Sequence, residues 1–196
     1  GKSGCGKTTL LRLLAGLEKP TAGAVSFSTK NPEIGFVFQE PRLMPWLTVS
    51  ENIAFATCKG GMSKEKLPQL LATLGLSAFA GSYPSELSGG MAQRTALGRT
   101  LFQNPDIILM DEPFGALDYF TRKGLQETLL ELFRKERKTI IFVTHDVEEA
   151  ILLGERVLIM QKGSITGAIP VKLSYPRDPA ASEVLSLRRQ ILAGLE

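Results

Sequence analysis

The sequence predicts an α/β fold with a mainly parallel sheet. Two observations carry this prediction. Short apolar runs, typical of buried strands, alternate along the chain with longer segments of helical periodicity. Several of these apolar runs also end directly in polar or charged residues, as strands do at the functional edge of an open α/β sheet. With 196 residues, 43% of them hydrophobic, the chain is large enough to bury a core.

Composition excludes several classes of protein. The formal net charge of +3 is mild, so we expect no nucleic-acid partner. No apolar run approaches the length of a membrane span, roughly 18 residues, and no signal peptide is found. The two cysteines, Cys5 and Cys58, are too few for a disulfide framework and favour a reduced, cytosolic setting.

The first nine residues match the phosphate-binding loop pattern G-x-x-x-x-G-K-[ST]. Glycines allow successive N–H groups to turn around a phosphate, and a helix predicted over Thr8–Gly16 would place its positive end beneath the same anion. Lys7 would reach the β- and γ-phosphates, and the Thr8 hydroxyl would bind Mg²⁺. The alternative is a glycine-rich turn that happens to precede a helix. The residues expected to bind a nucleotide are Gly1, Ser3, Gly4, Cys5, Gly6, Lys7, Thr8 and Thr9.

A loop of this kind normally follows a buried strand. The sequence begins on the loop's first glycine. We therefore expect this chain to be a fragment whose N-terminal strands are missing.

The other elements follow from local pattern. Apolar runs predict strands over Ala24–Ser28, Ile34–Phe38, Asp106–Met110, Thr139–Val143 and Arg156–Met160. Helical periodicity predicts helices over Ser50–Ile53, Ser63–Leu74, Tyr119–Arg137, Val147–Leu153 and Ser182–Leu195, and one more that ends at Phe102. Ser50 is the expected cap of its helix, Pro68 is an awkward interior residue, and Asn104-Pro105 stops the helix before it.

Asp111 and Glu112 follow the clearest core strand. Asp111 is expected to hold Mg²⁺, and Glu112 to take a proton from, or orient, an attacking water. Asp-Glu-Pro alone is equally ordinary strand-ending sequence. After four apolar residues, in a chain with a phosphate loop, the functional interpretation is preferred.

Two more polar residues follow core strands. His145, the only histidine, would contact the γ-phosphate or hold the water and Glu112 in place. Gln39 would touch Mg²⁺ or water. The alternatives are an ordinary loop histidine and a polar residue at a strand end.

Leu87–Met91 is a second candidate phosphate cradle. Its small residues Ser88, Gly89 and Gly90 expose N–H groups at a helix start. One chain seldom needs two cradles for one nucleotide, so the second suggests a site for the nucleotide of another copy. The alternative is a helix cap that contains glycines.

Together these segments resemble the ABC-type ATPases. They occur in the family's order over residues 1 to 146: Walker A (Gly1–Thr8), Q-loop (Gln39), signature (Leu87–Gln93), Walker B (Ile107–Glu112), D-loop (Phe114–Asp118) and switch histidine (His145). Met91-Ala92 replaces the commoner glutamine at the fifth signature position. More narrowly, Gln39–Val49 and Pro176–Asp178 are similar to the nitrate, sulfonate and taurine import group.

The resemblance implies a P-loop NTPase with a RecA-like lobe (residues 1–38 and 105–165), a helical ABC-specific lobe (residues 39–104) and a C-terminal tail (residues 166–196). It implies ATP and Mg²⁺ as cofactors. It also implies a head-to-tail homodimer with ATP between Walker A of one copy and the signature of the other. The family's adenine-stacking aromatic is expected upstream of Gly1.

By the same resemblance, ATP-driven closure and opening would power transmembrane permease subunits from the cytoplasmic face of the membrane. A periplasmic or lipoprotein solute-binding protein would take part indirectly. Pro45, Trp46 and Leu47 would help form the groove for a permease helix, which fits exposed apolar residues at a partner site.

The predicted function is therefore the ATP-hydrolysing subunit of an importer for nitrate, sulfonate, taurine or a similar small solute. A soluble ABC-type ATPase not coupled to transport would carry a long coiled-coil insertion or two cassettes. This chain has one cassette and no long insertion between Lys7 and Ser88. The third interpretation is an inactive fragment.

Overall fold

The computed structural model describes residues 1–55, 64–115, 117–136 and 138–195. Cys58, the predicted break at Lys59–Gly61 and the predicted helix start at Ser63 lie outside these residues. The chain divides into two compact units: Gly1–Glu18 with Val143–Glu196, and Lys19–Phe142. In the described parts of the chain, no helix has the length and apolar character needed to span a membrane. The lobe boundaries expected from the sequence remain predictions.

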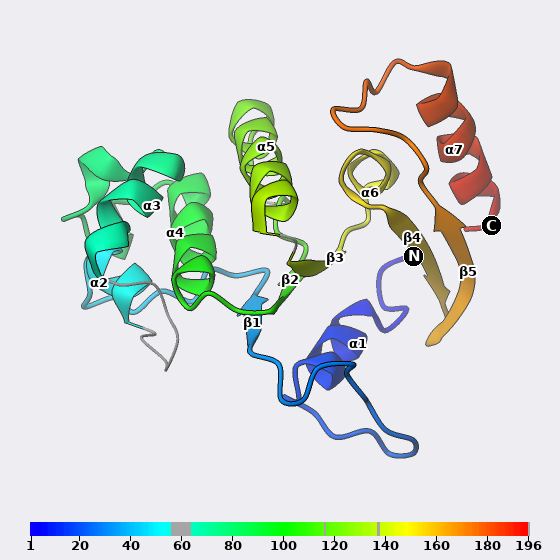
Figure 1. Cartoon of the computed structure of the whole chain (residues 1–196), viewed down its shortest axis with the longest axis horizontal. Helices are drawn as coiled ribbons and strands as arrows, with labels where there is room; N and C mark the ends of the chain where they lie inside the picture. Colours follow the sequence, from blue (N-terminus) through cyan, green and yellow to red (C-terminus); the bar gives the residue numbers. More distant parts are fainter. Residues whose placement is uncertain (56–63, 116, 137, 196) are drawn as a thin grey trace. The chain divides into compact units, whose positions relative to one another are not determined.

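The first unit contains three helices and a hairpin (Figure 1). Its elements are α1 (Lys7–Leu14), α6 (Val147–Leu153), β4 (Arg156–Gln161), β5 (Ser164–Pro170) and α7 (Ser182–Ala193). β4 and β5 pair antiparallel. Lys162 and Gly163 turn between them with φ of 47° and 79°, the positive values that a tight hairpin turn requires.

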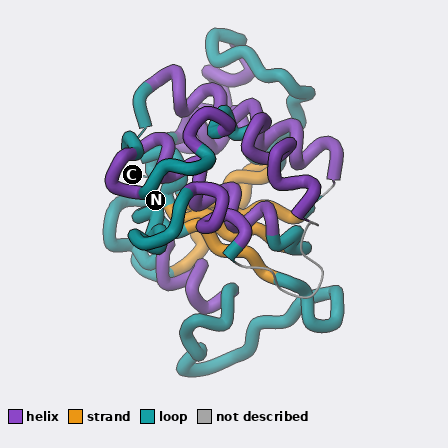
Figure 2. Tube along the Cα trace, turned by 90° about the vertical axis from the view of Figure 1, so that its left-hand side faces the viewer, coloured by secondary structure: helices purple, strands orange, loops and turns teal. Residues whose placement is uncertain are grey.

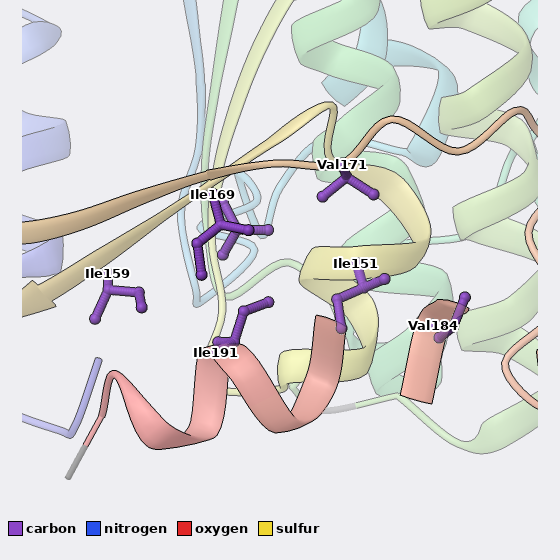
Figure 3. Packing of buried hydrophobic residues seen from close by; sticks show 7 residues of the cluster. Ile151, Ile159, Ile169, Val171, Val184 and Ile191 are labelled. Atoms are coloured by element: carbon purple, nitrogen blue, oxygen red, sulfur yellow. The ribbon is translucent and has the colours of Figure 1, made fainter. Parts of the chain in front are cut away.

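The core of the first unit lies between the hairpin, α6 and α7 (Figure 3). Ile151 of α6 is fully buried there, and Val184 and Ile191 on one face of α7 pack into the same cluster. β4 and β5 contribute Val157, Ile159 and Ile169, and Val171 follows directly after β5. The predicted tail helix is therefore part of this core.

The second unit contains the three-stranded sheet, in the order β1 (Ile34–Val37), β2 (Ile107–Asp111), β3 (Thr139–Val143). β1 and β2 are parallel, with Ile34 opposite Ile107 and Val37 opposite Met110. The helices are α2 (Val49–Ala54), α3 (Leu67–Thr73), α4 (Gly89–Phe102) and α5 (Tyr119–Glu136). Short 3₁₀ turns cover η1 (Lys64–Lys66), η2 (Ser77–Phe79) and η3 (Pro84–Glu86).

α4 is the centre of the helical part, where it packs against α2, α3 and β1. Gly98 lies at the centre of this packing. A Cβ there would lie 2.7 Å from Leu74 Cδ1 and 3.0 Å from Ile53 Cδ1, so a larger residue would require both side chains to move. A glycine thus suits this close contact of α4 with α2 and with the residue that follows α3.

The α/β fold with a parallel strand pair is confirmed, three local predictions are corrected, and one strand was missed. Ala24–Ser28 is not a strand, because this exposed stretch has no partner strand among the described residues to share its hydrogen bonds (Figures 1 and 2). Thr48, not Ser50, caps α2. Pro68 lies in the first turn of α3, where its missing N–H costs nothing. β5 was not predicted.

Candidate active site

The phosphate loop opens the first unit. Gly4 and Gly6 have φ of 76° and 98°, which side-chain-bearing residues rarely adopt, and Gly6 is the N-cap of α1. Lys7 folds back over the loop, where its Nζ donates to the carbonyl oxygens of Gly1 at 3.0 Å and Lys2 at 3.1 Å. The ammonium group is thus held at the loop, beside the positive end of a helix.

The β4–β5 hairpin packs against this loop. Gly163 N–H in the hairpin turn donates to the Cys5 carbonyl oxygen at 3.0 Å, and the Cys5 side chain is only 9% exposed. A Cβ on Gly1 would overlap the Met160 carbonyl oxygen in β4. The hairpin therefore packs closely against the start of the loop and donates a hydrogen bond to its middle.

His145 lies in the first unit, between β3 and α6, and its side chain is exposed. The residues on either side of it are held tightly. Thr144 Oγ1 donates to Glu149 Oε2 at 2.6 Å and accepts from Asp146 N–H at 3.0 Å. Asp146 caps α6 by accepting from Glu148 N–H at 2.8 Å and Glu149 N–H at 3.3 Å.

Asp111 and Glu112 lie in the second unit. Asp111 is the last residue of β2 and is only 5% exposed. Glu112 is half-buried and has φ of 46°, a conformation unusual for a residue with a side chain. Its carbonyl oxygen accepts from Gly115 N–H at 3.2 Å. The main chain thus turns sharply where β2 ends.

The predicted D-loop leads from this turn into α5. Phe114 is buried and meets the Phe142 ring edge-on, with ring centroids 6.3 Å apart. Asp118 accepts from Thr121 N–H at 3.1 Å, and this hydrogen bonding to Thr121 lowers the pKa of its carboxyl group. Ala116 lies outside the described residues. The loop is therefore anchored at both its apolar start and its capped end.

Gln39 follows β1 with an exposed side chain, and α4 secures the main chain around it. Gln93 Nε2 donates to the Phe38 carbonyl oxygen at 3.4 Å. Arg99 donates from Nη2 to Pro41 at 3.0 Å and from Nη1 to Arg42 at 2.9 Å, in both cases to the carbonyl oxygen. Burial lowers the pKa of Arg99. Two side chains of one helix thus hold three carbonyl groups flanking Gln39.

The segment that follows presents Trp46, which is 69% exposed. Asn52 is fully buried beneath it. Its Oδ1 accepts from Met44 N–H at 2.8 Å, while its Nδ2 donates to the carbonyl oxygens of Met44, Leu47 and Thr48 at 3.1, 2.9 and 3.0 Å. The main chain that presents the exposed indole is therefore fixed by a buried amide.

The second cradle begins α4. Ser88 is the N-cap, and its Oγ accepts from Met91 N–H at 3.3 Å. Ser88 and Gly89 are exposed, while Gly90 is half-buried. A Cβ on Gly90 would lie 3.0 Å from Thr121 Cγ2 of α5, so a small residue is needed there. The helix start therefore leaves two small residues facing solvent.

Comparison with known proteins decides the family. The model of the ABC transporter family matches residues 1–115, more than half of the chain. The chain belongs to the ABC transporter family. It is 49% identical over 197 residues to the aliphatic sulfonates import ATP-binding protein SsuB 1 of Pseudomonas savastanoi pv. phaseolicola, covering all of this chain and 82% of that protein. It is 44% identical over 204 residues to SsuB of Bacillus subtilis, covering 80% of that protein.

Solved structures agree. A dimeric ATP-binding cassette in a post-hydrolysis state, bound to ADP and Pi, matches this ABC cassette with a TM-score of 0.77 and 34% identity, over 89% of this chain and 84% of that one. A dimeric bacterial ABC transporter cassette matches with a TM-score of 0.76 and 35% identity, over the same shares. The cassette fold is therefore shown, and cassettes of this kind form dimers.

The two units divide the predicted site residues of the cassette. The first carries Gly1–Thr9 and His145, and the second carries Gln39, Ser88–Gly90, Asp111 and Glu112. Sequence reasoning missed Arg99 and Asn52, which hold main-chain carbonyls from elsewhere in the second unit. It also missed Thr48, although Thr48-x-x-Glu51 is a readable capping-box pattern.

Proposed function

We propose that this chain is the ATP-binding and ATP-hydrolysing subunit of an importer for aliphatic sulfonates. The observation that supports it most is the 49% identity, over the whole chain, to an aliphatic sulfonates import ATP-binding protein. The nitrate and taurine solutes that the sequence left open are the rival outcomes of the test below.

In this proposal the phosphate groups of ATP bind the loop of the first unit. The left-handed glycines turn N–H groups toward an anion, the α1 dipole favours negative charge, and the Lys7 ammonium neutralises the β- and γ-phosphates. Thr9 and Ser3, both exposed at this loop, add hydroxyl groups. Their short reach suits oxygen atoms of a bound phosphate chain.

The donors expected for Mg²⁺ fit a hard cation, because all are oxygens: the Thr8 hydroxyl, the Gln39 amide and the Asp111 carboxylate. When bound, Mg²⁺ would neutralise charge on the transferred phosphate.

We propose that Glu112 accepts the proton of the attacking water. His145 is proposed to contact the γ-phosphate and to help orient it for the reaction. The unusual φ of Glu112 supports this role, because strained backbone collects at functional sites. The exposed imidazole of His145, on a tightly capped turn, supports the second role.

A head-to-tail homodimer would place the exposed Ser88–Gly90 cradle on the ATP of the other copy. The dimeric relatives support this assembly. Permease subunits would dock at Pro45, Trp46 and Leu47, and the chain would work as a peripheral protein at the cytoplasmic face of the membrane. The exposed indole of Trp46 supports this docking site.

Glu112→Gln tests the enzymatic half of the proposal. It removes the proton acceptor but keeps size and hydrogen bonding, so we expect ATP binding to persist and steady-state hydrolysis to fall about a hundredfold or more. Glu127→Gln, an exposed glutamate on α5, is the matched control and should keep full activity. Activity of Glu112→Gln above about a tenth of the parent would overturn the assignment.

Growth tests the transport half. A bacterial strain lacking its sulfonate ATPase subunit, given this chain with its cognate permease and binding protein, should grow on an aliphatic sulfonate as sole sulfur source. Trp46→Ala should abolish this growth and co-purification with the permease, while Phe27→Ala, an exposed aromatic elsewhere, should not. Rescue of nitrate uptake alone would reject the sulfonate assignment, and growth on taurine, itself an aminoalkanesulfonate, but on no unsubstituted alkanesulfonate would narrow the solute to taurine.

A further inference from the structure

The helix that follows His145 is short and is held at both ends. α6 has seven residues, and Asp146 caps its start directly after the histidine. A helix leaves its last carbonyl groups without partners in the helix. In α6 these groups are met by two side chains of the tail, Tyr175 and Arg177.

Arg177 donates hydrogen bonds to carbonyl groups at the end of α6. Its Nη1 donates to the carbonyl oxygen of Ile151 and, at 2.7 Å, to that of Gly154. Tyr175 Oη donates to the Leu153 carbonyl oxygen at 2.6 Å, and its ring lies 4.0 Å below the guanidinium carbon. A cation at a helix C-terminus also complements the helix dipole.

The same guanidinium ties α6 to the chain after β5. Arg177 Nε and Nη2 both donate to the Leu173 carbonyl oxygen, at 3.1 and 3.0 Å. On the apolar side of α6, Ile151 packs against Val184 and Ile191 of α7 (Figure 3). The helix therefore cannot shift along its axis without breaking charge-assisted hydrogen bonds at one end or the Asp146 cap at the other.

We propose that Arg177, with Tyr175 stacked against it, is a positioning residue for His145. Arg177 holds the C-terminal end of α6, and His145 lies just before the N-terminal end of the same helix. Two residues of the tail thereby set the position of the imidazole. The inference rests on the proposed function, in which His145 contributes to hydrolysis. A purely structural Arg177 would stabilise the first unit without affecting the imidazole.

A spectroscopic readout separates these two roles. Because His145 is the only histidine, a proton–carbon correlation spectrum of chain labelled at the histidine Cε1 contains one imidazole signal. The chain is compared with Arg177→Met, Tyr175→Phe and the matched control Arg189→Met, an exposed arginine on α7. Steady-state hydrolysis and Mg-ATP affinity are measured on the same samples.

We expect Arg177→Met to displace the His145 signal and to lower kcat about tenfold with little change in Mg-ATP affinity, since small misplacements of catalytic groups are costly. Tyr175→Phe, which loses one hydrogen bond, should shift the signal less and lower kcat about twofold. Arg189→Met should do neither. Arg177→Lys keeps the positive charge but lacks the several N–H donors of the planar guanidinium, so its kcat should lie between those of Arg177→Met and the parent.

Two results would overturn the proposal: a His145 signal that stays at its parent position in a folded Arg177→Met, whether or not kcat falls, or an equal signal change in Arg189→Met. If Arg177→Met does not fold, the His145 signal of Tyr175→Phe, compared with those of the parent and Arg189→Met, tests the proposal in its place. A parent chain without Glu112-dependent hydrolysis would overturn the proposed function, and this inference with it. Normal parent hydrolysis with an unmoved signal would overturn the inference alone.

Discussion

The main chain around Gln39 and the main chain around His145 are held in place in two different ways. Each follows a core strand and presents an exposed polar side chain. Around Gln39, side chains of a distant helix hold the main chain directly, through Arg99 and Gln93 on carbonyl groups. Around His145, a local cap holds the turn, and the distant arginine holds the other end of the helix that follows.

The difference follows from what comes after each strand. His145 is followed at once by α6, so neighbouring residues such as Asp146 can satisfy the main-chain groups of the turn. Gln39 is followed by residues 40–47, which form no helix or strand. Arg99 of α4 supplies partners for the carbonyl groups of Pro41 and Arg42, nearest to Gln39, and Asn52 of α2 does so for those of Met44 and Leu47. We infer that the Gln39 loop depends on one distant arginine more than the His145 loop does on any single residue.

Replacing Arg99 by methionine tests this dependence most severely. The change removes two charge-assisted hydrogen bonds from a half-buried site and leaves two carbonyl groups without their partner. We expect the free energy of unfolding to fall by about 2–3 kcal/mol and hydrolysis to fall about tenfold. Urea unfolding gives the first quantity and steady-state kinetics the second.

Arg99→Lys is the matched control, because it keeps the charge but cannot reach both carbonyls in a fork. It should lie between the parent and Arg99→Met in both measurements. Equal stability of parent and Arg99→Met would mean that the loop is held by other contacts, and the contrast with the His145 loop would be lost.

The same contrast explains what could be predicted from the sequence. β1, β2 and β3, and the polar residues that end them, follow from local apolar runs, so the candidate site residues could be placed at strand ends. Arg99 could not be assigned a role, because its partners lie far from it in sequence. β5 was missed, because in its alternating, largely exposed pattern only Ile169 is buried. The strand predicted over Ala24–Ser28 was wrong for the opposite reason. Its sequence pattern fits a strand, but a strand also needs a neighbouring strand with which to form hydrogen bonds.

Replacing Asp146 by alanine tests the local solution. The change removes an N-cap that accepts from two main-chain N–H groups, so we expect a loss of about 1 kcal/mol in unfolding free energy. Hydrolysis should fall less than in Arg99→Met, because Arg177 still holds the other end of α6. Asp146→Asn keeps the capping oxygen and should stay within a few tenths of a kcal/mol of the parent. A larger loss in Asp146→Ala than in Arg99→Met would reverse the comparison.

The smallest effect is expected where the Gln39 loop itself ends in a local cap. Thr48 and Glu51 form a capping box at the start of α2: Glu51 N–H donates to Thr48 Oγ1 at 3.3 Å, and Thr48 N–H donates to Glu51 Oε2 at 2.8 Å. The backbone and side-chain hydrogen bonds from Thr48 lower the pKa of Glu51 in the folded chain. The ionised carboxylate therefore contributes stability above its unfolded pKa, and that contribution is lost as the pH falls through the lowered, folded value.

Glu51→Gln keeps the capping geometry but removes the charge. At neutral pH the variant should melt slightly below the parent, and the difference should shrink as the pH falls through the lowered pKa of Glu51 and the parent carboxyl group becomes protonated. Hydrolysis at neutral pH should be unchanged, because Asn52 and Arg99 still hold the residues between Gln39 and Thr48. Thermal unfolding at several pH values measures the first effect and steady-state kinetics the second. A melting difference that persists at acid pH would show that the carboxylate charge is not the source of the stability, and a clear loss of hydrolysis would show that the local cap controls the loop after all.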